Sequence, residues 1–235
     1  EKLLVYDYVS NGSLHAALHG GTPNPSQPPL HWAARLKIVQ GAARGLAHIH
    51  DCSPRKYVHG NIRSSKILLD DDLHPYISGF GLARLASSTH KPSSHSTSRK
   101  LGPGSAHPVA PPGRLPNSPS ASYLAPEARL AGVGAAQKSD VYAFGVVLLE
   151  VVTGRVPGVR AEQDDVELEG FVRRAFREER PLSEVVDPAL LHEVHAKKQV
   201  LAMFHLALGC TESDPDARPR MRAVSEGLDR VGGPQ

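Results

Sequence analysis

The sequence predicts an α+β fold that is mainly helical, with a few short strands near its N-terminal end. Apolar residues recur at three- and four-residue spacing over most of the chain, which is typical of amphipathic helices. Short runs rich in β-forming residues occur only before residue 80. The 235 residues are 40% hydrophobic and 22% charged, a composition typical of a globular domain.

The front of the chain is predicted to form one strand and two helices. Residues 2–9 (KLLVYDYV) favour a strand that ends at the turn sequence SNG. Ser13 can then cap a short helix, SLHAALHG, before a proline-rich loop over residues 22–29. A long helix follows, and its apolar stripe consists of Trp32, Leu36, Val39, Ala43, Leu46 and Ile49.

Residues 57–85 contain two short apolar runs on either side of an acidic turn. The runs ILL at 67–69 and YI at 76–77 are predicted strands, and DDD at 70–72 joins them. The tripeptide HGN precedes the first strand, and GFG follows the second.

Residues 86–122 differ from the rest of the chain. Ser, Thr, Pro, His and Gly dominate there, and large apolar residues are nearly absent. Such a segment cannot bury enough surface to offset its ordering entropy, so we expect a long disordered loop.

The remaining chain is predicted to be helical. Residues 139–153 (SDVYAFGVVLLEVVT) are apolar nearly all round, which predicts a buried central helix ended by Gly154. Further helices are expected over residues 168–176 and 199–211, and from about 218 to 231.

Bulk properties exclude several function classes. A formal net charge of +3 is too small to predict nucleic-acid or membrane-surface binding, and the 13 histidines are interpreted mainly as solvated surface residues. Two cysteines, Cys52 and Cys210, fit a reducing compartment. The longest apolar run, residues 141–152, is too short to span a bilayer, and no signal peptide is visible. The start at Glu1, without Met and within a predicted strand, suggests a fragment.

The order and spacing of these motifs resemble those of eukaryotic protein kinases. Residues 59–66 match the catalytic loop H-R-D-L-x-x-x-N, and residues 79–81 match the D-F-G element. APE at 125–127 matches the end of the activation segment, and SDVYAFG at 139–145 the start of the central helix. The sequences EKLLVYDYVSNGSL at residues 1–14 and RPRM at residues 218–221 are most similar to those of plant receptor-like kinases of the leucine-rich-repeat type.

The resemblance implies a protein-kinase-like fold, mainly the α-helical C-terminal lobe with the hinge strand. Residues 1–9 would be the last strand of the N-terminal lobe and the hinge, and residues 10–235 the C-terminal lobe. Residues 86–122 would be an insertion in the activation segment. The family's Gly-rich loop, its phosphate-holding Lys and the Glu partner of that Lys are not found in these 235 residues.

Three positions of the implied catalytic site depart from the family. Asn61 stands where the family has its catalytic Asp, Lys66 where it has the metal-binding Asn, and Gly79 where it has the metal-binding Asp. Arg63 replaces the usual catalytic-loop Lys and keeps its charge, while Gly60 replaces an Arg. No metal ligands are expected, and magnesium binding is not predicted.

Other family positions are kept. By resemblance, His59 and Phe80 belong to a stacked apolar column, Asp140 holds the catalytic loop, and Glu127 pairs with Arg218. The nucleotide-binding positions are Tyr6 (the gatekeeper), Asp7, Tyr8 and Val9 (the hinge), Leu68 (under adenine) and Lys66. ATP binding through hinge backbone groups, with Arg63 and Lys66 facing the phosphates, stays an open alternative to a purely surface role for both cations.

The sequence therefore indicates a receptor-like pseudokinase, a signalling module that acts by contact. Its expected partners are other protein kinases or components of a receptor complex, at the cytoplasmic side of the plasma membrane. Membrane attachment is expected only through a parent transmembrane segment outside this chain. Two alternatives remain: an unconventional Ser/Thr kinase that uses Arg63 and Lys66 in place of metal, and a truncated product without function.

Overall fold

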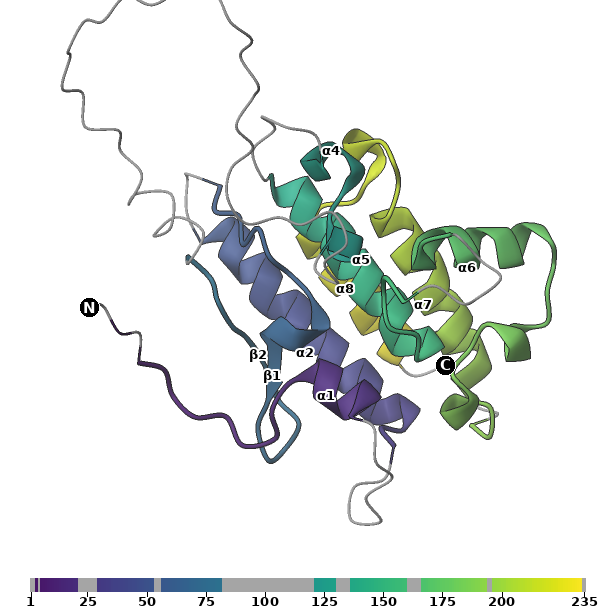
Figure 1. The fold of residues 1–235 in the computed structure, drawn as a ribbon, viewed down its shortest axis with the longest axis horizontal. Coiled ribbons are helices and arrows are strands. Elements are labelled where there is room, and N and C mark those ends of the chain that lie inside the picture. The colour runs from purple at the N-terminus through teal and green to yellow at the C-terminus, as the bar shows by residue number, and fades with distance from the viewer. Residues whose placement is uncertain are drawn as a thin grey trace, which may run out of the picture.

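The computed structural model describes residues 3, 5–20, 29–52, 56–81, 121–129, 136–159, 166–193 and 196–233. Within these ranges a body of helices carries one small two-stranded sheet (Figure 1). The helices and strands are α1 (Leu14–His19), α2 (Trp32–Asp51), β1 (Ile67–Leu69), β2 (Pro75–Ile77), α4 (Pro126–Arg129), α5 (Gln137–Thr153), α6 (Leu168–Arg177), α7 (Lys197–Cys210) and α8 (Met221–Gly232). Single 3₁₀ turns are η1 (Ser64–Lys66), η2 (Ala121–Tyr123), η3 (Leu182–Glu184), η4 (Pro188–Leu190) and η6 (Pro215–Ala217).

Helix α5 lies at the centre of the body. It packs against α7, α6 and α2, so its side chains are buried on every side from residue 139 to residue 153 (Figure 1). Gly154 ends it in the left-handed conformation, with φ of 65°, which glycine adopts without steric cost. The prediction of a buried central helix is confirmed.

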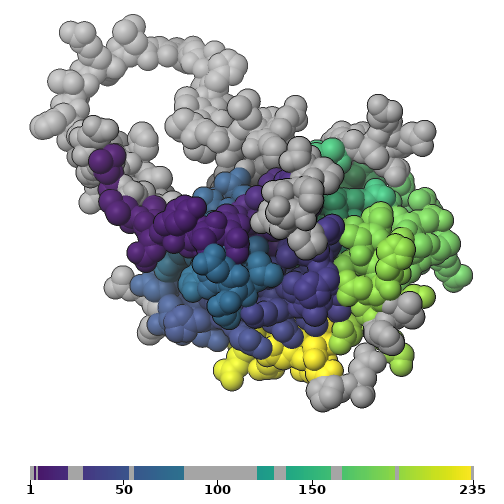
Figure 2. Space-filling model, turned by 90° about the horizontal axis from the view of Figure 1, so that it is seen from below, coloured from purple at the N-terminus to yellow at the C-terminus, as the bar shows by residue number. Residues whose placement is uncertain are grey.

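Helix α2 connects this core to the small sheet. One face of α2 packs against α8 and another against β2. Strands β1 and β2 pair antiparallel, with Ile67 opposite Ile77, so the two predicted strands are confirmed. The backbone of residues 11–13 lies along β1, where the Asn11 N–H donates to the Leu69 carbonyl at 2.9 Å. In the space-filling view the N-terminal segment therefore lies at the surface beside the hairpin (Figure 2).

The strand predicted over residues 2–9 is not formed where the structure describes it. Residues 5–9 have no regular secondary structure, and the Val5 and Tyr8 side chains are 92% and 89% exposed. A strand requires a partner whose backbone satisfies its N–H and C=O groups. Neither β1 nor β2 pairs with residues 5–9, so β propensity alone does not order them.

Two other predictions, the loop over residues 86–122 and the start of the last helix, are tested only in part or differ from the structure. Residues 86–120 of the expected disordered loop lie outside the described residues, while Ala121 and Ser122 begin η2. The last helix begins at Met221 rather than near Arg218, because Arg218 precedes Pro219 and is held extended with ψ of 143°. None of the helices within the described ranges combines the length and apolarity needed to cross a membrane.

Candidate functional site

The catalytic-loop segment is held from below by the Asp140 carboxylate, which α5 presents in its first turn. Oδ1 accepts the Gly60 N–H at 2.7 Å, and Oδ2 accepts the His59 N–H at 2.7 Å. The ring Nε2 of His50 also lies 2.9 Å from Oδ2. Asp140 is 1% exposed, so these hydrogen bonds replace the ones to water that the carboxylate loses on burial. The predicted role of Asp140 is confirmed.

The His59 ring is fixed in one neutral tautomer by its neighbours. Its Nε2 lies 3.1 Å from the Ser78 carbonyl and must donate, whereas Nδ1 accepts the Asn61 N–H at 3.3 Å. Burial lowers the pKa of His59 below its ordinary value, although Asp140 and the Ser78 carbonyl act in the opposite direction. The centroids of the Phe80 and His59 rings lie 6.3 Å apart, so the two rings are neighbours as predicted. Phe80 is nevertheless 41% exposed.

Lys66 and Gly79, at the positions that bind metal in the family by resemblance, lie close to each other. The Ser78 N–H donates to the Lys66 carbonyl at 2.8 Å, which places the exit of β2 beside the entry of β1. A Cβ added at Gly79 would lie 3.6 Å from Cδ, Cε and Nζ of Lys66. The end of the Lys66 side chain, including its ammonium, therefore lies in van der Waals range of any side chain that position 79 would carry.

This arrangement does not fit a magnesium ion. Magnesium prefers oxygen ligands, usually one or two carboxylates besides the substrate phosphates. Gly79 has no side chain, and the Lys66 ammonium repels a cation. Gly79 also has φ of 83°, where a side chain adds strain. The sequence analysis predicted no metal ligands here on the identities of Lys66 and Gly79 alone, and the structure adds their arrangement.

The expected catalytic residues lie at the tip of the loop. Asn61 is exposed, and Arg63 is half-buried in extended backbone just before η1. Neither side chain is a general base, because an amide is not basic and a guanidinium stays protonated. The structure thus brings Lys66 and Gly79 together, and it places Asn61 at the open surface.

The expected nucleotide-binding residues do not form a closed pocket. Tyr6 is 63% exposed, Asp7 and Tyr8 are also exposed, and Val9 and Leu68 are half-buried. Leu68 is nevertheless linked to the chain that follows these residues, because its backbone forms a bridge with Ser13. Their roles in binding adenine stay a prediction.

The end of the activation segment is tied to the C-terminal part of the chain. Arg218 donates to both carboxylate oxygens of Glu127, as the sequence predicted. The Ser139 hydroxyl donates to the same carboxylate at 3.0 Å. Burial raises the pKa of Glu127, but the hydrogen bonds from Arg218 and Ser139 outweigh it and hold that pKa below its ordinary value.

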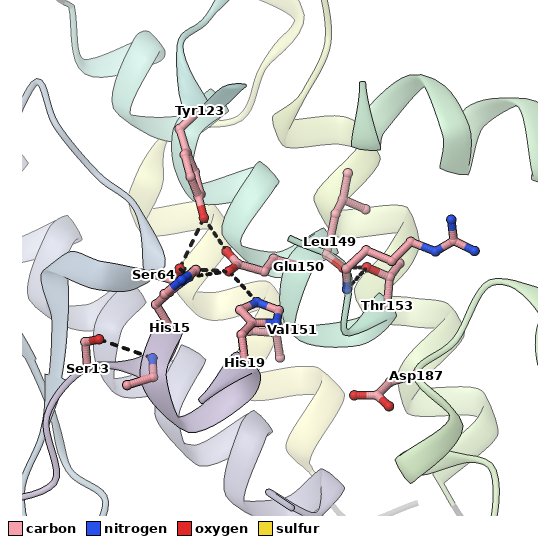
Figure 3. Close-up of polar contacts among 12 residues, drawn as sticks. Ser13, His15, His19, Ser64, Tyr123, Leu149, Glu150, Val151, Thr153 and Asp187 are labelled. Atoms are coloured by element: carbon pink, nitrogen blue, oxygen red, sulfur yellow. Dashed lines mark hydrogen bonds and ion pairs between the residues drawn. The ribbon is translucent and has the colours of Figure 1, made fainter. Parts of the chain in front are cut away.

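Two buried charged residues were missed by the sequence reasoning. Arg35 of α2, 2% exposed, donates to the Val151 carbonyl at 2.6 Å and pairs with Asp187 at 2.7 Å. Glu150 of α5, fully buried, lies among polar side chains of η1, η2 and α1 (Figure 3). In both helices a charged residue interrupts an apolar stretch of the sequence, and this could have indicated a buried charge.

Comparison with known proteins agrees with the motifs. The model of the protein kinase domain family matches residues 1–227. A probable inactive leucine-rich repeat receptor-like protein kinase of Arabidopsis thaliana is 39% identical over 98% of the chain, which covers 32% of that protein. A leucine-rich repeat receptor-like protein kinase and a probable inactive receptor kinase of the same plant are each 37% identical over 98% of the chain. The chain covers 33% and 32% of their lengths.

The chain therefore spans about a third of the curated relatives named above. The family match instead extends over almost the whole chain, and it includes the catalytic loop, the A-P-E element and Arg218. On this evidence the chain belongs to the protein kinase domain family, with leucine-rich repeat receptor-like kinases of plants among its relatives.

Proposed function

We propose that this chain is a pseudokinase module, which takes part in signalling by binding other proteins rather than by transferring phosphate. The observation that carries the proposal is the Lys66 side chain lying over Gly79. In phosphoryl transfer, bound metal ions bridge the phosphates and neutralise the charge that develops on them. A lysine over a glycine removes the metal ligands and adds a charge of the wrong sign.

The third departure acts in the same direction. Asn61 can orient a hydroxyl by hydrogen bonding, but it cannot accept its proton. Loss of a general base alone typically lowers the rate by about 10²- to 10⁴-fold. Together with the loss of the metal ligands, this makes the chain a poor phosphotransferase while the Asp140 contacts keep the loop in shape.

Nucleotide binding is a separable part of the proposal. The hinge positions Tyr6, Asp7, Tyr8 and Val9 would bind adenine through backbone groups, which do not depend on the side chains. Lys66, together with Arg63, would face the phosphates in the absence of magnesium. In this view ATP is a ligand and not a substrate.

The setting of the proposed function is a receptor complex at the cytoplasmic face of the plasma membrane. Two of the three named relatives carry the word inactive in their names, and all three are named receptor or receptor-like kinases. The partner that fits this setting is an active protein kinase or one of its substrates.

Two measurements test the proposal on the 235-residue chain and on the longest product of its gene. The first is phosphate transfer from labelled ATP to the chain and to a general protein acceptor, with magnesium, manganese or chelator. We expect incorporation no higher than that of the N61A variant. Magnesium-dependent incorporation that stops when the cleft is blocked would overturn the proposal, and turnover that persists in chelator would support the unconventional kinase instead.

The second measurement is thermal unfolding with ATP, with and without magnesium. A ligand at about 100 times its dissociation constant stabilises a protein by about 2.7 kcal/mol, which is readily detected. A shift with ATP alone, unimproved by magnesium, is expected for metal-free binding. Absence of any shift removes the nucleotide part and leaves the contact function, whereas a chain that neither folds nor binds another protein would indicate the truncated product.

A further inference from the structure

Two histidines on successive turns of α1 face a buried carboxylate of α5. His19 Nε2 lies 2.9 Å from Glu150 Oε1, and His15 Nδ1 lies 3.5 Å from the same oxygen. The three ligand atoms lie within 4.8 Å of one another. In Figure 3 both imidazoles point from α1 toward the Glu150 side chain, with Ser64 beside them.

The carboxylate at the centre of this cluster lies among imidazole and hydroxyl groups. Glu150 is 0% exposed, and its ion-pair partners there are the imidazoles of His15 and His19. Its other hydrogen bonds come from two hydroxyl groups, Ser64 at 2.8 Å and Tyr123 at 2.6 Å. Burial of a carboxylate is costly unless hydrogen bonds or a cation compensate it, and a metal ion can be that cation.

We propose that His15, His19 and Glu150 form a binding site for a zinc ion. The ligand set is the Nδ1 of His15, the Nε2 of His19 and the Oε1 of Glu150. The Ser64 hydroxyl or a water molecule completes a tetrahedron. In this site the zinc ion replaces the proton that joins His19 to Glu150.

Two of the distances already suit zinc, and the others require the side chains to adjust. Bonds of about 2.0–2.1 Å in a tetrahedron place neighbouring ligand atoms roughly 3.3–3.4 Å apart. The His15–Glu150 distance of 3.5 Å already matches, and so does the 3.3 Å between Ser64 Oγ and His15 Nδ1. The His19–Glu150 distance of 2.9 Å and the Ser64–Glu150 distance of 2.8 Å, now hydrogen bonds, have to lengthen by about half an ångström. The ligand nitrogens of His15 and His19, which lie within 4.8 Å of each other, have to settle at roughly 3.3–3.4 Å.

The ligand types select the class of ion. Imidazole nitrogen suits zinc and neighbouring transition metals, whereas magnesium and calcium prefer an all-oxygen shell. The entry path is on the His15 side, since that side chain is 42% exposed while that of His19 is 11% exposed. The site is thus buried at its carboxylate and open at one imidazole.

Tyr123 positions the carboxylate for this site. Its hydroxyl donates to Oε2 of Glu150, which leaves Oε1 directed at the two histidines (Figure 3). Partners of this kind fix the orientation of a metal ligand, and their loss typically weakens metal affinity about 10- to 100-fold.

The proposed site would join four separate parts of the fold. Its ligands come from α1 and α5, Ser64 comes from η1, and Tyr123 comes from η2. It does not include Asn61, Lys66 or Gly79, so it is independent of the proposed function.

Calorimetric titration of the full 235-residue chain with zinc tests the site. Every variant carries C52S, because Cys52 is an exposed thiol one helical turn after His48 and would compete for zinc. The parent chain, which also carries C52S, is compared with H15Q, H19Q and the control H48Q, which removes an exposed histidine of α2. Far-UV circular dichroism and thermal unfolding without metal establish that each variant is folded.

We expect one zinc ion per parent chain, an affinity lowered at least about 100-fold in both H15Q and H19Q, and unchanged binding in H48Q. Cobalt substituted for zinc should give the visible absorption of a tetrahedral site, and Y123F should weaken binding without changing that spectrum. H15Q carries the test if H19Q does not fold, because His15 is half-exposed. Absence of stoichiometric binding, or binding that survives either substitution, would overturn the site.

Discussion

Arg218 donates hydrogen bonds to both carboxylate oxygens of Glu127, at 2.7 and 2.8 Å, across 91 residues of sequence. The guanidinium is fully buried and also donates to the backbone carbonyls of Glu212, Lys138 and Ser213. The pair therefore fastens the end of the activation segment to the loop before α8. It persists although the residues that would use an activation segment for catalysis are replaced.

Removal of this carboxylate should destabilise the chain strongly. E127A leaves the Arg218 charge buried without its partner, and breaking a buried pair in this way costs about 3–5 kcal/mol. Urea unfolding measures the change. The matched control is D229A, which removes the exposed ion pair between Arg44 and Asp229 and should cost less than about 1 kcal/mol. Equal losses in the two variants would contradict the fastening role.

The same pair predicts a loss of stability in acid. The pKa of Glu127 is lower in the folded chain than its ordinary value of 4.5, so the unfolded chain binds the proton more readily. The contribution of Glu127 is therefore complete above about pH 4.5 and is lost as the pH falls through the folded pKa. The difference in unfolding free energy between the parent and E127Q should shrink below pH 4.5, and a constant difference would refute this account.

The contact between α5 and α7 predicts opposite effects for two glycine substitutions. A Cβ at Gly145 would lie 2.7 Å from the Cβ of Cys210 and 3.1 Å from the Ala207 carbonyl oxygen. G145A should cost about 1–3 kcal/mol by overpacking. At Gly209 a Cβ would meet nothing within 4 Å, so G209A should stabilise α7 by up to about 1 kcal/mol. Thermal unfolding of both variants checks the signs, and destabilisation by G209A would count against the packing described.

Restoration of the metal site should require two substitutions at once. G79D alone places a carboxylate beside the Lys66 ammonium, which should form an ion pair with it rather than bind a cation. K66N alone supplies one ligand oxygen and no charge. A magnesium-dependent increase in the ATP-induced thermal shift is expected for the K66N/G79D double variant and for neither single variant. An equal response of G79D alone would mean that Lys66 does not block the site.

Sequence motifs identified the contacts that depend on chain order. Asp140, Glu127 and Arg218 belong to segments that occur in a fixed succession, so their pairing was predictable and is confirmed. The replacements at positions 61, 66 and 79 were equally visible. That the Lys66 side chain lies against Gly79 was not, because it depends on how β1 and β2 pair in space.

Contacts made through helix packing escaped the sequence analysis. His19 and Glu150 are 131 residues apart, and the histidines were interpreted as mostly surface residues. The available signals were the four-residue spacing of His15 and His19 and the charge of Glu150 within an otherwise apolar helix. The strand predicted over residues 2–9 failed for a related reason, since β propensity does not supply a pairing partner.

Asp140 holds the catalytic loop through the backbone N–H groups of His59 and Gly60. Every amino acid except proline supplies such a group, so these two hydrogen bonds do not depend on the side chain at position 61, although the φ of 74° at Gly60 favours glycine there. Asn61 is exposed and its contact with His59 also runs through its backbone N–H, so a substitution there should cost little stability. Under the proposed function, the catalytic side chains can therefore be replaced while the backbone of the loop, and the surface that it presents to a partner, stay in place.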